Sequence, residues 1–155
     1  MKPKYLLNAV VLILCLYACK KGLNDPSHPA KILSAQDSTL ATQSLLIGKW
    51  NVVSDTTYAG VNTGTNPVVY KGQPGDYFDF RTDGFVYIKE GAMLDTLSFN
   101  VISGRQIGIT SFMSILNDQS ATCQLAGVTG DSLSIISPLL TPPGGPQQRM
   151  VSLSR

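Results

Sequence analysis

The fold is decided by the stretch Leu46-Ile47-Gly48-Lys49-Trp50-Asn51-Val52-Val53-Ser54-Asp55-Thr56-Thr57-Tyr58, which holds the only tryptophan of the 155-residue chain. It follows a long polar run and opens a region that alternates like successive strands up to the C-terminus. With a period of two, one face of the expected first strand carries Trp50, Val52, Ser54, Thr56 and Tyr58. The other face carries Lys49, Asn51, Val53, Asp55 and Thr57. A large indole just after a glycine, at the start of a first strand, is suited to plug one end of a β-barrel.

The composition favours one turn-rich β domain over a helical bundle. The chain is long enough for one domain, and it combines 14% charged residues with 14 glycines and 9 prolines. The first 18 residues contain Lys2 and Lys4 and no acid, so the rest of the chain has ten basic and ten acidic residues. This balance leaves no basic patch, and we expect no nucleic-acid partner.

The N-terminus has the pattern of a secretory signal. Lys2 and Lys4 precede an apolar run, residues 5–17, that is interrupted only by Asn8 and is too short to span a bilayer comfortably. It ends in Leu16-Tyr17-Ala18-Cys19, which resembles the lipobox of bacterial lipoproteins, although Tyr17 departs from the usual small or β-branched residue. The resemblance implies cleavage before Cys19, a lipid on its thiol and a membrane anchor. The alternative is a plain signal peptide followed by an incidental cysteine.

We therefore divide the chain into a signal peptide (1–18), a lipidated cysteine with a flexible tether (19–44) and a barrel domain (45–155). The tether is polar and contains Pro26, Pro29 and the only histidine, His28. Asp37 or Ser38 is in position to cap a short helix through residues 40–45 that ends at Gly48. The resemblance implies the bacterial cell envelope as location, and Lys20 favours the outer membrane, because an Asp there retains some lipoproteins at the inner membrane.

Eight strands follow from the alternation, at residues 48–58, 76–81, 85–89, 95–102, 105–110, 120–128, 131–137 and 147–154. Tight turns at 83–84, 103–104 and 129–130 alternate with longer connections at 59–75, 90–94, 111–119 and 138–146. Alternate connections of an up-and-down meander emerge at the same end. We therefore predict an all-β, eight-stranded antiparallel barrel with one shut end and one loop-framed mouth. Val68-Val69-Tyr70 is a candidate extra edge segment.

Three short stretches resemble the lipocalin superfamily, and more narrowly the lipocalin-like domains of bacterial lipoproteins. Gly48-Lys49-Trp50 matches the Gly-x-Trp of the first lipocalin strand, and Phe80-Arg81-Thr82-Asp83-Gly84 is similar to a strand–turn–strand signature of those bacterial domains. The ending Leu153-Ser154-Arg155 fits the family's habit of setting a basic residue against that Trp. The resemblance covers residues 45–155. It implies a barrel closed by Gly48, Trp50 and Arg155, a small and often apolar ligand, and no enzymatic activity.

The strand order leaves the state of the barrel interior open. Antiparallel pairing of the last strand with the first places Arg155, rather than Arg149, near Trp50. The alternation directs one apolar set inward, where it either lines a cavity for a ligand or fills it: Phe78, Phe80, Leu97, Phe99, Val101, Ile107, Ile109, Leu133 and Ile135. The first alternative is a carrier of a neutral apolar molecule. The second is an envelope protein with a filled barrel whose loops bind a protein or glycan partner.

We find no pattern for catalysis, a metal or a cofactor. There is no histidine outside the tether, and Cys123 is the cysteine that remains beyond Cys15 and Cys19, so we expect it to be a small buried hydrophobe. Three acids lack the spacing of a calcium loop and are expected on strand exteriors and a turn: Asp76, Asp79 and Asp83. No inward charge stands out, since Arg105 lies beside a tight turn and is expected to face solvent.

The apolar loop 111–116 is either a lid, ligand contact or partner surface, or it continues a strand or packs inside the barrel.

Overall fold

The computed structural model describes residues 35–60 and 67–155, all within the compact unit Leu33–Arg155. The signal peptide, Cys19 and the first part of the predicted tether lie outside the described residues. Nine strands lie within these ranges: β1 (Gly48–Ala59), β2 (Val68–Lys71), β3 (Tyr77–Phe80), β4 (Phe85–Glu90), β5 (Met93–Ser103), β6 (Gln106–Thr110), β7 (Ser120–Ala126), β8 (Ser132–Ile136) and β9 (Gln147–Ser154).

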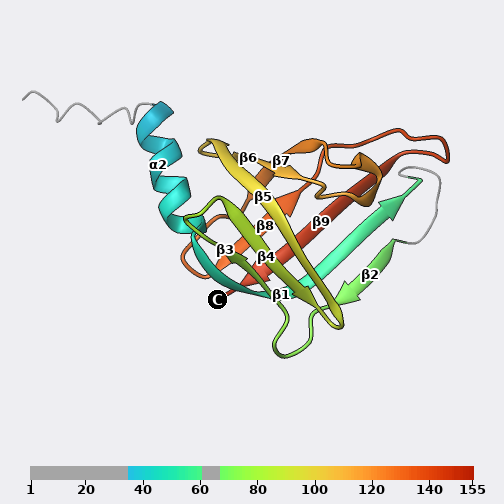
Figure 1. The fold of residues 1–155 in the computed structure, drawn as a ribbon, viewed down its shortest axis with the longest axis horizontal. Helices are drawn as coiled ribbons and strands as arrows, with labels where there is room; N and C mark the ends of the chain where they lie inside the picture. Colours follow the sequence, from blue (N-terminus) through green and yellow to red (C-terminus); the bar gives the residue numbers. More distant parts are fainter. Residues whose placement is uncertain (1–34, 61–66) are drawn as a thin grey trace, which may run out of the picture. The chain divides into compact units, whose positions relative to one another are not determined.

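The strands form a closed antiparallel barrel (Figure 1), which confirms the predicted fold class. From β3 to β9 each strand pairs with the next one along the chain, β1 pairs with β3, and β1 also pairs with β9 to close the ring. The short strand β2 is the predicted extra edge segment, and it pairs with the second half of β1, where Ser54 lies opposite Lys71. The barrel thus consists of eight strands, with β2 added beside β1.

The connection between β4 and β5 is shorter than predicted. Glu90 lies opposite Met93, so only Gly91 and Ala92 form the turn, and Gly91 has a positive φ of 60°. Such a backbone conformation favours glycine in a two-residue hairpin turn. The expected longer connection at 90–94 is therefore wrong. Both strands are therefore longer at the open end of the barrel, where β4 ends at Glu90 and β5 begins at Met93.

The helix α2 (Ala35–Leu46) covers the shut end, which carries the tight turns. Thr42 Oγ1 donates a hydrogen bond to the carbonyl oxygen of Gly104, at 3.0 Å, in the turn between β5 and β6. Asp37 and Ser38 both lie inside this helix, so neither is the predicted cap. The predicted domain boundary at residue 45 also falls inside α2. Residues 35–44 therefore belong to the folded unit rather than to a flexible tether.

Arg155 lies over Trp50 at the shut end, as the strand order predicted. The guanidinium carbon is 4.1 Å from the centroid of the indole ring, a cation–π distance. Arg155 Nη2 donates to the carbonyl oxygens of Leu45 (2.9 Å) and Ile47 (2.8 Å), while Trp50 Nε1 donates to that of Leu46 (2.8 Å). Gly48 has a φ of 119°, and an added Cβ there would lie 3.4 Å from Arg155 Nη2. The end of α2, the indole and the C-terminal arginine therefore form one hydrogen-bonded closure.

The interior of the barrel is filled by apolar side chains. All nine residues predicted to point inward belong to this core or pack against it, and Phe80 meets Phe99 edge to face with ring centroids 5.1 Å apart. Cys123 is fully buried, as expected, and burial raises the pKa of its thiol to about 12.

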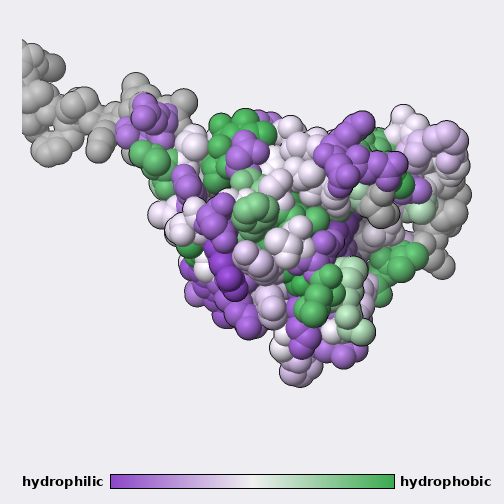
Figure 2. Space-filling model, viewed as in Figure 1, coloured by the Kyte–Doolittle hydropathy of each residue, from purple (hydrophilic) through white to green (hydrophobic). Residues whose placement is uncertain are grey.

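Outside the barrel, Figure 2 shows hydrophobic residues over β2 and over the turn between β4 and β5, where several large apolar side chains are exposed: Val68, Val69, Met93 and Leu94.

Candidate functional site

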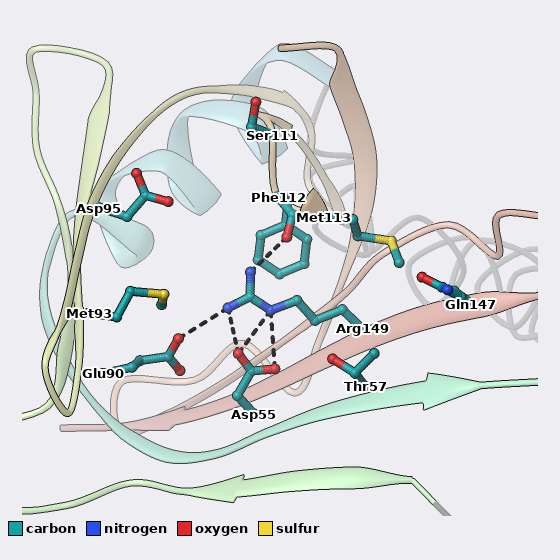
Figure 3. A pocket seen from close by; sticks show the side chains of 10 residues that line it. All are labelled: Asp55, Thr57, Glu90, Met93, Asp95, Ser111, Phe112, Met113, Gln147 and Arg149. Carbon is teal, nitrogen blue, oxygen red and sulfur yellow. Dashed lines mark hydrogen bonds and ion pairs between the residues drawn. The ribbon is translucent and has the colours of Figure 1, made fainter. Parts of the chain in front are cut away.

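A pocket of about 430 Å³ lies at the open end of the barrel, which carries the longer connections. Figure 3 shows its lining, which comes from β1, β4, β5, the loop after β6 and β9. The lining residues combine charged, polar and apolar side chains: Asp55, Thr57, Glu90, Met93, Asp95, Ser111, Phe112, Met113, Gln147 and Arg149. None of the nine residues predicted to line a ligand cavity is among them. The open end thus has a recess above the filled core.

A β-bulge in β1 turns Asp55 into this recess. Val52 lies opposite Leu153 of β9, but Ser54 lies opposite Ser152, so Val53 is one extra residue in β1. Beyond the bulge, Asp55 is opposite the buried Val151. Residues directly opposite each other share a face of the sheet, so Asp55 points inward. The predicted face for Asp55 and Thr57 is therefore wrong, because the bulge inverts the alternation along the strand.

Arg149 connects three elements in this recess through its guanidinium group (Figure 3). Its Nε donates to both carboxylate oxygens of Asp55, at 3.1 and 2.9 Å, and its Nη2 donates to Asp55 Oδ2 and to Glu90 Oε2, the latter at 3.2 Å. Its Nη1 donates to the carbonyl oxygen of Phe112 at 2.7 Å, and its Cζ lies 4.7 Å from the centroid of that ring. The exposed fractions of the Arg149, Asp55 and Glu90 side chains are 16, 11 and 6%. This corrects the expectation that no charge points inward.

Glu90 keeps one carboxylate oxygen without a partner. Oε2 accepts from Arg149, while Oε1 is buried and has no hydrogen-bond partner among the described residues. Burial raises the pKa of Glu90 to about 7; the negative charge of Asp55 also raises it, and Arg149 opposes the shift. A buried acceptor without a donor is uncommon in a folded protein. Glu90 is therefore a group that a bound donor would satisfy.

Asp76 supports the wall of the pocket beside Glu90. Its side chain accepts hydrogen bonds from the Tyr70 hydroxyl, from the Gln73 amide at 2.7 Å and from the Gly91 amide at 2.9 Å. The Tyr70 hydrogen bond is the largest cause of a lowered pKa for Asp76, and it raises the pKa of Tyr70 to about 12. Asp76 is buried, so its predicted place on a strand exterior is wrong. It joins β2 to the turn that follows Glu90.

The other predicted acids lie where expected. Asp79 forms an exposed ion pair with Arg81 at 2.8 Å, and Asp83 accepts from the amide of Phe85 at 3.0 Å within the tight turn. Arg105 is exposed, as its place beside a turn predicted. These residues lie outside the pocket.

The apolar loop after β6 packs inside the barrel mouth. Phe112 is fully buried and Met113 nearly so, and the short 3-10 helix η1 (Ser114–Leu116) follows them. Ser111 Oγ accepts from the Asp118 amide at 3.0 Å, which draws the ends of the loop together. Among the alternatives, packing inside the barrel is therefore the observed one. Together with Met93, Phe112 and Met113 form the apolar part of the pocket lining.

The missed site residues did carry a sequence signal. Arg149 has the same parity as Val151 and Leu153 in the last strand, and Asp95 has the parity of Leu97. Glu90 has the parity of the buried Val86 and Ile88 once its strand is extended to the two-residue turn. Asp55 had no such signal, because its orientation depends on the bulge.

Comparison with known proteins gives no relationship from which a function could be transferred. No protein-family model matches the chain, and no curated protein matches its sequence. Within the described ranges, no group of three or more His, Cys, Asp or Glu side chains is arranged to hold a metal ion. In the same part of the chain, no helix has the length and apolar character needed to cross a membrane. The sequence pattern of the N-terminus and the pocket are the features of this chain that point to a function.

Proposed function

We propose that this chain is a lipid-anchored protein of the bacterial cell envelope whose barrel binds a small molecule in the pocket at its open end. The anchor is supported by the sequence pattern of residues 1–19, with Lys2 and Lys4 before the apolar run and Leu16-Tyr17-Ala18-Cys19 at its end. The resemblance of that pattern to a lipobox, with Lys20 next, favours the outer membrane. The lipocalin-like barrel is a fold that can hold one small ligand.

The pocket at the open end is the single observation that carries the binding proposal. Its volume of about 430 Å³ falls within the usual range for small-molecule sites. It also combines an apolar lining with a few buried polar groups, which is the usual composition of such sites. Because side chains occupy the barrel below it, the ligand binds at the mouth and contacts residues such as Phe112 and Met113. Because the lining also holds charged side chains, the ligand is not expected to be a purely apolar molecule.

A pair of substitutions on β1 tests whether the pocket binds ligands. Thr57 lines the pocket, whereas Val53 is exposed on the same strand, so Thr57→Phe fills the pocket and Val53→Phe adds the same ring outside it. A collection of small fragments is screened by ligand-observed NMR against the full-length chain in detergent. We expect saturable binders that Val53→Phe retains and Thr57→Phe loses.

Two outcomes of this screen would contradict a ligand-binding function. The first is the absence of any saturable binder, and the second is binding that Thr57→Phe leaves unchanged. Either result would favour the other candidate function, a filled barrel whose loops bind a protein or glycan partner. The exposed apolar side chains over β2 and the β4–β5 turn are the observation that favours that candidate.

A further inference from the structure

The guanidinium group of the pocket is occupied within the protein, while one carboxylate acceptor is not. All three nitrogens of the Arg149 guanidinium already donate to Asp55, Glu90 or the Phe112 carbonyl. Glu90 Oε1, by contrast, is buried and unpaired within the part of the chain that the structure describes. Such a group is costly inside a protein, so a donor brought by a ligand would favour a turn of the Glu90 side chain that exposes Oε1 to the pocket.

A second carboxylate lies close to Glu90 on the same face of the sheet. Glu90 is opposite Met93, and Asp95 is opposite Ile88, so Glu90 and Asp95 are diagonal neighbours across β4 and β5. Diagonal positions of an antiparallel pair are separated by roughly 7–8 Å, within reach of long side chains. Asp95 accepts from the amide of the adjacent Thr96 at 2.7 Å, and its side chain lines the pocket. Once the Glu90 side chain turns toward the pocket, one ammonium group with three N–H donors can serve both carboxylates.

The lining of the pocket carries more negative than positive groups. Three carboxylates, those of Asp55, Glu90 and Asp95, accompany the single guanidinium of Arg149 among the lining residues. Charge of one sign in a recess with low-dielectric walls attracts ligands of the opposite sign.

The rest of the lining fits an apolar group attached to the cation. Met93, Phe112 and Met113 provide side chains without charge beside the carboxylates, as Figure 3 shows. Thioether and aromatic side chains pack well against aromatic and short aliphatic groups. A strongly hydrated inorganic cation would gain nothing from these contacts.

We infer that the pocket takes a small organic cation, an ammonium on a short apolar group, whose N–H groups donate to Glu90 Oε1 and to Asp95. This inference rests on the proposed small-molecule function and specifies its ligand class. The apolar group lies against the two methionines and Phe112. Arg149 holds Glu90 Oε2 and Asp55 in place and does not contact the ammonium.

Three matched aromatic probes test this ligand class: benzylamine, benzyl alcohol and benzoate. They share a ring and differ in the charge of the head group. The full-length chain in detergent is labelled with ¹³C at its methionine methyl groups. Met93 and Met113 line the pocket, whereas Met150 lies on β9 outside the lining and is an internal control. We expect benzylamine to shift Met93 and Met113, and to bind at least ten-fold more tightly than benzyl alcohol, with benzoate the weakest.

Two variants show whether the carboxylates cause this preference. Glu90→Gln removes the charge and keeps the shape, and it is expected to weaken benzylamine at least ten-fold and to change benzyl alcohol less than two-fold. Asp95→Asn alters an exposed carboxylate, so it leaves the fold intact, and it is expected to give a smaller loss in the same direction. An unchanged Met150 signal shows that each variant is folded.

Three results would contradict the inference, and each has a different meaning for the pocket. Equal binding of amine and alcohol at Met93 and Met113 would overturn the inference and leave the small-molecule function standing. Tighter binding of benzoate would overturn it as well, and it would assign the recognition to Arg149. If no probe shifts either methionine, the inference fails, and the fragment screen with Thr57→Phe decides separately whether the pocket binds ligands.

Discussion

Arg149 of β9 forms an ion pair with Asp55 of the neighbouring strand β1, with its Nε 3.1 and 2.9 Å from the two carboxylate oxygens. The two residues are 94 positions apart in the chain, and they meet where β9 pairs with β1 to close the barrel. Arg155, which directly follows β9, lies over Trp50 at the other end of the same seam. Each end of the closing seam therefore has an arginine that joins it to other elements of the barrel.

The first prediction concerns the arginine at the open end. Arg149→Leu leaves Asp55 and Glu90 buried without their cation, and the loss of one partner of a buried pair costs about 3–5 kcal/mol. We expect the free energy of unfolding to fall by that amount in chemical denaturation. The double variant Asp55→Leu/Arg149→Leu is expected to be more stable than Arg149→Leu, because it removes a buried carboxylate.

Arg105→Leu is the matched control for this prediction, since Arg105 is exposed and lies outside the ion cluster. Surface substitutions of this kind usually change stability by less than about 0.5 kcal/mol. An Arg149→Leu variant as stable as Arg105→Leu would show that the open-end ion cluster does not hold the seam together.

The second prediction concerns the pH dependence of stability. The pKa of Glu90 is raised from 4.5 to about 7, so the folded protein keeps a proton that the unfolded chain releases at lower pH. The free energy of unfolding therefore falls as pH rises from about 4.5 to about 7, and this group contributes no further change above that range. Burial is the main cause of the raised pKa, the charges of Asp55 and Asp76 add to it, and Arg149 opposes it.

The Glu90→Gln variant isolates this effect. Glutamine cannot titrate, so the difference in stability between wild type and variant is expected to shift in favour of the variant between pH 5 and pH 8. Both proteins share every other titrating group, including Asp76 with its lowered pKa. Denaturation midpoints measured at several pH values check the prediction, and parallel curves for the two proteins would contradict it.

The third prediction concerns the closure at the shut end. Trp50 is fully buried, and its truncation to alanine is expected to cost about 3–5 kcal/mol. Arg155→Ala removes a cation–π contact worth about 0.5–2 kcal/mol together with hydrogen bonds to Leu45 and Ile47, so its effect is smaller. Thermal unfolding measures both. A Trp50→Ala variant that melts like wild type would mean that the indole is not the plug of the barrel.

The sequence predicted the barrel and its shut end well because both depend on local signals. Alternating hydrophobicity locates strands, and glycine turns determine which connections are short, so the strand order followed from the sequence alone. Antiparallel closure then placed Arg155 beside Trp50 without any information on side chains. The turn at Gly91 was missed because Met93 and Leu94 are both apolar and do not alternate. The sequence pattern therefore predicted the start of this strand at Asp95, two residues after its observed start.

The candidate site was harder to predict because it depends on departures from regular alternation. The bulge at Val53 inverts the face of Asp55, and nothing in the local sequence marks an extra residue there. The burial of Glu90 and Asp76 depends on partners from other strands, such as Arg149 and Tyr70. Charged residues near predicted loops were therefore assigned to the surface, although their partners hold them inside.

The fourth prediction concerns the membrane anchor and uses the two cysteines of the N-terminal segment. Cys19 follows Leu16-Tyr17-Ala18 in the lipobox-like pattern, whereas Cys15 lies within the apolar run that cleavage would remove. In a bacterial host, Cys19→Ala is expected to abolish lipid attachment, so that the protein either appears in the soluble fraction or keeps its uncleaved N-terminus. Cys15→Ala is expected to behave like wild type, because its side chain is absent from the mature protein. Detergent partitioning and intact mass distinguish these cases. If Cys19→Ala partitions and weighs as the wild type does, apart from the single substitution, the chain is not anchored through this cysteine.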